Sequence, residues 1–516
     1  MRPELASGDG AEGALADGAE RLAELAGWLV RNAGQHVRAL IEDVGDDSAA
    51  VAREAEALYE SARDRIDQAW DQLDGAREAV RAAPRISRVV GECLTLLARH
   101  RVLAALAAAR SELTGEPAAA RDALHRHTAR RLRILCEDLR GGILKLGQFA
   151  STRGDLLPAP YLQELSRLQD RVRPVAAAAV VARLEDALGP DWGGRFASFE
   201  PRPIAAASLA QVHGATLADG TPVAVKLLVP EIEEIVETDL AALRTLVPNV
   251  RGVLHRVDVD TLATELSRSV RRELDLEAEA RSAGELRASF AADPDVIVPE
   301  VYREASGRGV LVMERIDGER LVDFLDGCER RGPAGARDRD RILGILVRSF
   351  CEQILVHGIF QGDPHPGNFL VVRGPAGPRL ALLDFGCIER YDAELRARYG
   401  ALTIAILSRD EAGMAEQFEA LGFRSRDGSG DGLRAYAELF LSAFRDGMRL
   451  DASVDHAAQI RRILELTDQD PISDLPGHFV LLGRVFASLG GLLVRYRPQI
   501  ALSDLLRRPL AAAEGA

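Results

Sequence analysis

The chain has 516 residues, of which 47% are hydrophobic and 28% are charged, so it is long enough to bury a large two-lobed core and to carry an appendage. Its formal net charge of -14 argues against a nucleic-acid-binding protein, because such proteins need a basic surface that displaces phosphate counterions. The five cysteines are scattered without a C-x-x-C pair. This pattern predicts neither a disulfide framework nor a zinc site, and it favours a reducing cytosol.

The first residues lack the basic and apolar regions of a signal peptide, and no uninterrupted apolar run reaches the roughly 18 residues that a membrane span needs. The nearest candidate, Phe479 to Val494, is interrupted by Arg484 and is expected to form a buried helix. We therefore expect a cytoplasmic protein whose association with membranes, if any, is peripheral.

The N-terminal region, residues 1–85, is predicted to be an acidic tail followed by a helical hairpin. Residues 1–17 are small and acidic, as in a disordered tail. Apolar residues then recur every three or four positions through two stretches joined at Gly45-Asp46-Asp47. We interpret the hairpin as a structural cap or as an arm that forms homo-oligomers. Docking to a partner or lipid surface is the alternative, although an acidic polar face disfavours anionic lipids.

Residues 86–175 are predicted to be helical, and the sequence K-L-G-Q at Lys145 to Gln148 stands out on an apolar helix. Gly147 inside that helix costs roughly 1 kcal/mol relative to alanine, which predicts close packing at this position. Lys145 and Gln148 are three residues apart and share a helix face. Taken alone, Lys145 is slightly better explained as a cation that extends from a buried helix to solvent.

A β-rich region follows, in which Pro203 to His213 leads through a turn at Asp219-Gly220 into a strand ending Val223-Ala224-Val225-Lys226. This is the pattern of a kinase N-lobe, whose strand lysine holds nucleotide phosphates. The expected glycine-rich loop is replaced by Ala205-Ala206-Ala207-Ser208. Alanine excludes the positive-φ conformations that glycine adopts, so we predict an altered nucleotide pose over this loop.

A long charged helix is predicted around Glu273 to Ala280. In kinases one carboxylate of this helix pairs with the strand lysine, and we select Glu279 as the partner of Lys226. Glu273 and Asp275 are one to two turns earlier, toward the expected cleft.

The stretch from Leu311 to Gly318 is predicted to be the hinge strand between the lobes. There the backbone amides, at Glu314 and Ile316, are expected to meet an adenine base.

The densest motif runs from Gln361 to Gly386. Asp363 and Asn368 form a D-x-x-x-x-N loop made rigid by two prolines, and an apolar hairpin then leads to the D-F-G sequence that begins at Asp384. In kinases the first element supplies a base and a metal ligand, and the second supplies a metal carboxylate. Carboxylate and amide oxygens suit Mg²⁺, which completes its shell with nucleotide phosphates. We therefore predict Asn368 and Asp384 as magnesium ligands and Asp363 as the catalytic aspartate.

Three features around this motif argue against ordinary protein phosphorylation. Gly362 replaces the arginine that reads activation-loop phosphate in typical protein kinases. The D-F-G sequence leads within a few residues into a predicted helix, so there is no peptide-docking segment and no A-P-E. His365 replaces the phosphate-contacting lysine of serine/threonine kinases.

With these motifs in order, the chain resembles the UbiB/AarF family of atypical kinases over about residues 90–500; residues 1–85 fall outside the resemblance. The elements that carry it are K-x-G-Q at Lys145 to Gln148, the Ala205–Ser208 loop, Lys226, Glu273 and Asp275, the D-P-H-P-G-N loop, and D-F-G. The resemblance implies K-x-G-Q helices over the cleft, with Lys145 engaging Glu273 or Asp275. It also implies ATP or ADP binding with Mg²⁺, conditional ATPase activity, and a role in the metabolism of isoprenoid quinones or related lipids. Many relatives carry C-terminal transmembrane helices, and no such span is predicted here.

The resulting prediction is an α+β, bilobed protein kinase-like fold with family-specific N-terminal helices over the cleft and an added helical N-terminal arm. Its regions are the tail and hairpin (1–85), the K-x-G-Q helical extension (86–175), the kinase-like N-lobe (176–318) and the helical C-lobe (319–516). In this hypothesis Lys226, oriented by Glu279, holds phosphates, and Asp363 orients the attacking water or hydroxyl. The residues predicted to form a gate that excludes protein substrates are Lys145, Gln148, Glu273 and Asp275.

Two alternatives remain from sequence. The glycine before Asp363 and the H-P-G-N that follows it are also typical of aminoglycoside and choline kinases, which are small-molecule phosphotransferases. The second alternative is a non-catalytic, nucleotide-dependent scaffold that binds partners through its N-terminal helices. A lipid or quinone intermediate is a predicted ligand of the leading hypothesis alongside the nucleotide.

Overall fold

The computed structural model describes residues 117–151, 159–169, 174–240, 259–425 and 476–514, together with single positions between 85 and 100, residue 157 and three short strands between 444 and 474. The predicted tail and helical hairpin of residues 1–84 therefore lie outside the described residues. The described chain forms two compact units. Unit 1 comprises the chain up to Arg183 with residues 202–212 and 227–274, and unit 2 comprises residues 184–201, 213–226 and 275 onward.

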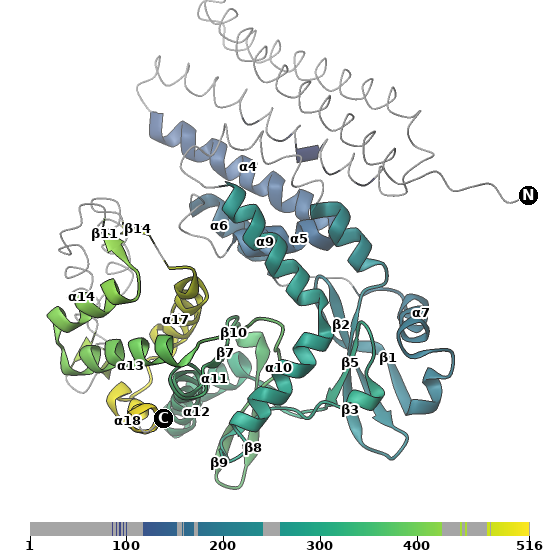
Figure 1. Cartoon of the computed structure of the whole chain (residues 1–516). Helices are drawn as coiled ribbons and strands as arrows, with labels where there is room; N and C mark the ends of the chain where they lie inside the picture. Colours follow the sequence, from purple (N-terminus) through teal and green to yellow (C-terminus); the bar gives the residue numbers. More distant parts are fainter. Residues whose placement is uncertain are drawn as a thin grey trace, which may run out of the picture. The chain divides into compact units, whose positions relative to one another are not determined.

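Unit 1 is built mainly from helices. Its elements are α4 (Pro117–Leu139), α5 (Gly141–Ala150), α6 (Ala159–Leu165), the short 3-10 helix η2 (Ser166–Gln169) and α9 (Val259–Leu274), and Figure 1 shows α4, α5, α6 and α9 side by side. The chain turns sharply between α4 and α5, where Arg140 and Gly141 both have positive φ. The apolar core of the unit lies beneath α5 and includes Cys136, Ile143, Leu144, Leu165 and Leu168.

A buried acidic residue holds the start of α5 in place. Asp239, which is 0% exposed, accepts hydrogen bonds from the Ile143 amide at 3.3 Å and from the Arg85 guanidinium at 2.7 and 2.9 Å. A carboxylate at a helix N-terminus satisfies amides that have no partner within the helix. The helix that carries K-x-G-Q is therefore fixed at its N-terminus by contacts distant in sequence.

The strands begin with a four-stranded sheet in the order β1-β2-β3-β5, formed by β1 (Phe196–Ala206), β2 (Ala210–Leu217), β3 (Pro222–Leu228) and β5 (Val310–Glu314). The stretch from Pro203 to His213 is the end of β1, a tight turn and the start of β2, and the turn lies at the predicted Ala205–Ser208 loop. The Ala207 amide donates to the Ala210 carbonyl at 2.8 Å across that turn. Helix α7 (Ala177–Leu188) precedes β1.

The predicted long helix around residue 275 is two helices, α9 and α10 (Leu276–Ser289). Asp275 leaves the helical conformation with φ -91 and ψ 77, and its side chain accepts the Ala278 amide at 2.8 Å as the N-cap of α10. Aspartate favours this position because its short side chain satisfies an otherwise unpaired amide. Charge and helical periodicity are continuous across residue 275, so they do not reveal the break.

The C-terminal part of unit 2 surrounds one hydrophobic core. Its elements are β4 (Val296–Ile297), β6 (Glu319–Arg320), α11 (Leu321–Arg330), α12 (Pro333–Glu352), a π-helical turn η5 (Gln353–His357), β7 (Ile359–Gln361), β8 (Phe369–Gly374), β9 (Gly377–Leu382), β10 (Ile388–Arg390), α13 (Ala393–Ser408), α14 (Glu411–Ala420), α17 (Gly477–Tyr496) and α18 (Leu502–Glu514). Strands β8 and β9 form the predicted antiparallel hairpin.

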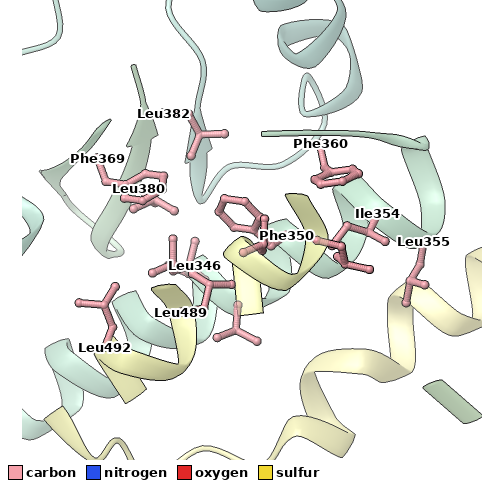
Figure 2. Packing of buried hydrophobic residues seen from close by; sticks show 14 of the residues in the cluster. Leu346, Phe350, Ile354, Leu355, Phe360, Phe369, Leu380, Leu382, Leu489 and Leu492 are labelled. Atoms are coloured by element: carbon pink, nitrogen blue, oxygen red, sulfur yellow. The ribbon is translucent and has the colours of Figure 1, made fainter. Parts of the chain in front are cut away.

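Figure 2 shows how α12, the hairpin and α17 share this core. The rings of Phe350 of α12 and Phe369 of the hairpin lie 6.1 Å apart between centroids, and Leu346, Leu382 and Leu489 of α17 belong to the same core. The helix predicted at Phe479 to Val494 is confirmed as most of α17, but only one side of it is buried: Leu482, Val485 and Leu489 lie in the core while Phe486 and Val494 are exposed. Short strands β7 and β10 pair antiparallel beside it, so the loop before Asp363 and the segment after D-F-G are held together.

Candidate functional site

The central feature of unit 2 is an ion pair between Lys226 of β3 and Glu279 of α10. The lysine Nζ lies 2.6 Å from Glu279 Oε1 and 2.7 Å from Oε2. The glutamate side chain is only 1% exposed and the lysine 17%. Strand alternation sets Lys226 between buried Val225 and Leu227. The Asp275 cap fixes the first turn of α10, which carries Glu279. The predicted partner of Lys226 is confirmed.

Burial and ion pairing act on Glu279 in opposite directions. Burial raises the pKa of the Glu279 carboxyl above its ordinary value, while the nearby Lys226 ammonium lowers it and the Asp384 carboxylate raises it further. Both carboxylate oxygens lie within hydrogen-bond distance of the ammonium, so each partner stabilises the charged form of the other. Removing either partner would leave an uncompensated charge in a buried position. The pair therefore sets the position of the lysine ammonium.

Asp384 lies next to this pair. Its Oδ1 accepts the Gly386 amide at 2.9 Å, and its Oδ2 is 3.9 Å from the Lys226 ammonium. The following residue, Phe385, is 1% exposed and belongs to the core. The Asp384 carbonyl accepts the side-chain amide of Gln361. The aspartate is thus held by backbone and core contacts while its side chain is 42% exposed.

The loop between β7 and β8, which carries Asp363, is held by hydrogen bonds within it and by hydrogen bonds to the residues on either side of D-F-G. The Gly362 amide donates to the Cys387 carbonyl at 2.7 Å. His365 Nδ1 accepts the Gly367 amide at 3.1 Å, and Asn368 Nδ2 donates to the Asp363 carbonyl at 3.0 Å. The Leu383 amide donates to the Asn368 carbonyl at 3.0 Å, so the two predicted metal ligands are carried by adjoining backbone segments. The Asn368 hydrogen bond assigns its side-chain oxygen as the acceptor that remains.

Sequence reasoning missed one charged neighbour of this loop. Arg484 of α17 donates through Nη2 to Asp363 Oδ1 at 2.7 Å, with side-chain exposures of 24% and 39%. One turn later, Ser488 Oγ donates to the Pro364 carbonyl at 2.7 Å. The only sequence signal was a charge that interrupts the apolar run of α17, and that signal does not identify its partner.

The segment after D-F-G is short, as predicted. Three residues of β10 follow Cys387, and α13 begins at Ala393, capped by Asp392, whose side chain accepts the Leu395 amide at 2.8 Å. The Tyr391 hydroxyl donates to the His478 carbonyl at 2.5 Å, at the start of α17. No long peptide-docking segment occurs between β10 and α13, a stretch that the structure describes in full.

The predicted hinge is β5 with the residues that follow it. The Glu314 amide donates to the Glu300 carbonyl at 2.8 Å, and the Arg315 amide donates to the Pro222 carbonyl at 3.3 Å. The Glu314 amide is therefore already used within the fold. Ile316 follows the strand in a half-buried position.

The K-x-G-Q residues lie in unit 1, where they contact two of the other predicted residues. Lys145 Nζ is 2.5 Å from Glu273 Oε1, with side-chain exposures of 20% and 29%. Gln148 donates through Nε2 to the Leu168 carbonyl at 2.9 Å, and its Oε1 accepts Ser208 Oγ at 3.4 Å. Of the two predicted partners of Lys145, Glu273 makes the ion pair. The other, Asp275, caps α10 in unit 2.

Two local features of unit 1 agree with the sequence reasoning. A Cβ added at Gly147 would lie 2.6 Å from Leu168 Cδ1 and 2.9 Å from Cys136 Sγ, so close packing explains the glycine. Among the residues of the alanine loop, from Ala205 to Ser208, none has a positive φ, as expected for side chains that exclude that conformation.

The donor set of unit 2 fits a magnesium–nucleotide complex. Asp384 offers a carboxylate and Asn368 an amide oxygen, and both are hard oxygen donors of the kind Mg²⁺ requires. Within the described residues, no cluster of three or more His, Cys, Asp or Glu side chains is arranged to hold a metal ion. Two protein ligands suit an ion that takes its remaining oxygens from phosphates and water.

A strand lysine paired with a helix glutamate, an aspartate–asparagine loop and a D-F-G aspartate define unit 2 as a protein kinase-like core. The sequence profile of the ABC1 atypical kinase-like domain matches residues 167–418. The probable protein kinase UbiB of Pseudomonas paraeruginosa is 32% identical over 75% of this chain and 67% of its own length, and that of Marinobacter nauticus is 31% identical over 75% and 65%. The chain therefore belongs to the UbiB/AarF family of atypical kinases, as its motifs predicted.

A solved structure supports the same fold. Rv3197 from Mycobacterium tuberculosis, determined as a complex with erythromycin, is 25% identical and has a TM-score of 0.52 over 72% of this chain and 92% of its own. The matched part of the present chain spans about two thirds of the length of the two UbiB relatives. Across the residues that the structure describes, no helix combines the length and apolar character needed to cross a membrane.

Proposed function

We propose that this protein binds ATP or ADP with Mg²⁺ and hydrolyses ATP, or transfers its terminal phosphoryl group, in support of isoprenoid quinone or related lipid metabolism. The observation that carries the proposal is the assembly of Lys226, Glu279 and Asp384 in one unit, with Lys226 within 3.9 Å of both carboxylates. Phosphoryl transfer needs a positioned cation, metal ligands and an oriented nucleophile more than it needs covalent chemistry.

Each residue has a distinct task in this proposal. Lys226, oriented by Glu279, contacts the α- and β-phosphates. Asn368 and Asp384 would hold Mg²⁺, which neutralises the charge that develops on the phosphoryl oxygens. Asp363 orients the attacking water or hydroxyl. Adenine would be held at the hinge by the Glu314 carbonyl and the Ile316 amide, since the Glu314 amide already has a backbone partner.

The loop and gate residues complete the proposal. The backbone of Ala205 to Ser208 would meet the nucleotide in a pose altered by its restricted conformations. Lys145, Gln148, Glu273 and Asp275 are proposed as the gate that excludes protein substrates. The short segment after D-F-G supports an acceptor other than an ordinary peptide.

Two other functions remain testable. A small-molecule phosphotransferase is favoured by Gly362 before Asp363, and a panel of phosphate acceptors would distinguish it. A relative of the same fold was solved with a small molecule, erythromycin, so macrolides belong in that panel. A nucleotide-dependent scaffold would bind nucleotide without turnover.

The deciding experiment measures Mg²⁺-dependent ADP release by the purified protein. It is run alone and with vesicles of phosphatidylcholine, with or without phosphatidylglycerol, beside Asp384→Asn and the control Asp504→Asn. Asp504 is a 65% exposed carboxylate on α18, so it controls for the loss of one charge. We expect the Asp384 variant to lose at least about 100-fold in rate, because electrostatic stabilisation of the transition state is the main catalytic effect. Nucleotide binding without ADP release in the wild type under all conditions would favour the scaffold.

A further inference from the structure

The contact between α17 and the catalytic loop has no role in the function proposed above. Arg484 and Ser488 are four residues apart and therefore share a face of α17. From that face they donate to the Asp363 carboxylate and the Pro364 carbonyl, both at 2.7 Å. One guanidinium and one hydroxyl of α17 thus bond consecutive residues of the loop. The paired residues are 121 and 124 positions apart in sequence.

The same helix also occupies the space beside the residue before Asp363. A Cβ added at Gly362 would lie 3.3 Å from Leu481 Cδ1 and 3.1 Å from Cys387 Sγ. A larger side chain there would require Leu481 of α17 or Cys387 to shift by a few tenths of an ångström. A side chain at this position would therefore be crowded by Leu481 and Cys387, and Arg484 brings a cation to the neighbouring aspartate from α17.

The start of α17 is joined to the segment after D-F-G as well. The Tyr391 hydroxyl donates to the His478 carbonyl, and the Tyr399 hydroxyl lies 2.9 Å from His478 Nδ1. A single helix therefore contacts both the loop that carries Asp363 and the segment that follows D-F-G. In kinases with a long activation segment, phosphorylation of that segment links it to the loop that carries the catalytic aspartate.

We propose that Arg484 is a positioning residue, and that α17 holds Asp363 in its working orientation without any phosphorylation. The ion pair uses Oδ1 of the aspartate and fixes the rotation of the carboxylate, so that Oδ2 faces the acceptor hydroxyl or water. Ser488 prevents the loop backbone from moving away from the helix. This inference rests on the proposed phosphoryl-transfer function and names a further residue that such a reaction requires.

The first test is kinetic and uses Arg484→Met, Arg484→Lys and the matched control Arg495→Met. Arg495 is on the same helix and pairs with Asp326 at 3.0 Å, with a side chain that is 57% exposed. We expect Arg484→Met to lower kcat for ADP release by roughly 10- to 100-fold, the effect of a small misplacement of a catalytic group, with KM for ATP within about threefold of wild type. Arg484→Lys should restore part of kcat, and Arg495→Met should match wild type. Equal losses in kcat for both methionine variants would overturn the proposal.

The second test is a double-mutant cycle with Asp363→Asn. If Arg484 acts through Asp363, then Arg484→Met should reduce kcat little further in the Asp363→Asn background, since residues in one contact act non-additively. Losses that multiply independently would mean that the arginine acts elsewhere.

The third test does not depend on turnover and separates this inference from the proposed function. Hydrogen–deuterium exchange of a peptide covering residues 361–369 should rise severalfold in Arg484→Met and in Ser488→Ala but not in Arg495→Met. Unchanged exchange in all variants would contradict the positioning role, even in a protein that releases ADP. Increased exchange in a protein that releases no ADP would sustain the positioning role and refute only the proposed activity.

Discussion

Replacing Lys226 with methionine removes the cation that both carboxylate oxygens of Glu279 contact, at 2.6 and 2.7 Å. The glutamate side chain is 1% exposed, so water cannot replace the lost partner. Breaking a buried pair by removing one member costs about 3–5 kcal/mol. The carboxylate can avoid part of this cost by taking up a proton. From an unperturbed pKa near 4.3, neutralisation at pH 7 costs about 3.7 kcal/mol. We therefore expect Lys226→Met to lower the free energy of unfolding by about 3–4 kcal/mol at pH 7.

The sign of the pH dependence follows from the same reasoning. Burial raises the pKa of Glu279, and Lys226→Met removes the ammonium that lowers it most, leaving the weaker lowering by the backbone hydrogen bond from Phe385. Between the unfolded pKa and the raised folded pKa, the folded variant then holds one proton more than the unfolded chain. Its stability therefore falls by up to about 1.4 kcal/mol for each unit of rising pH. The destabilisation should shrink to about 1 kcal/mol at pH 5, where neutralising the carboxyl costs little.

The assay is urea-induced unfolding at pH 5 and pH 7 of the wild type, Lys226→Met and the double variant Lys226→Met/Glu279→Gln. The double variant carries no buried charge at this position, so it should recover more than half of the loss at pH 7 and show little difference between the two pH values. A single variant equally destabilised at both pH values, or a double variant no more stable than the single, would refute the explanation by an uncompensated buried carboxylate.

Three further predictions concern unit 1 and the thiols. Gly147→Ala should lower stability by about 1–2 kcal/mol in urea unfolding despite the better helix propensity of alanine, because its Cβ would lie within 3 Å of Leu168 and Cys136; a more stable variant would contradict the packing. Lys145→Ala, which breaks the contact with Glu273, should raise autophosphorylation measured with radiolabelled ATP, whereas unchanged or lower incorporation would count against the gate. Desolvation raises the pKa of three thiols to about 12, those of Cys93, Cys136 and Cys351. At pH 8 only about one in 10,000 of each thiol is then ionised, so alkylation mapped by mass spectrometry should be slow until urea unfolds the chain. Fast modification of the folded protein would show that these thiols are accessible.

Local motifs allowed much of the site to be predicted. The V-A-V-K strand and the D-F-G hairpin each combine a short periodic pattern with a chemically specific residue, and such patterns are read within a few positions. The pairing of Lys226 with Glu279 was predicted because the kinase-like arrangement places one acidic residue of the next helix opposite the strand lysine. Gly147 was assigned to close packing from its cost within a helix, and its two near neighbours bear this out.

Other features depend on contacts that no local pattern contains. The break between α9 and α10 depends on Asp275 acting as a cap rather than as one more charge on a continuous helix. Arg484 reaches Asp363 across 121 residues, and Gln361 reaches the Asp384 carbonyl across 23.

The sequence by itself determined the kinase-like class and the absence of a long activation segment, and it predicted the phosphate and metal ligands, since each is written in residue types at short, characteristic spacing. Only the tertiary structure decided which charge accompanies Asp363, where the helix at Asp275 ends, and which acidic residue Lys145 contacts. The physical reason is that an ion pair or a cap is selected by which groups burial brings within about 3 Å, and that selection depends on how the whole chain packs.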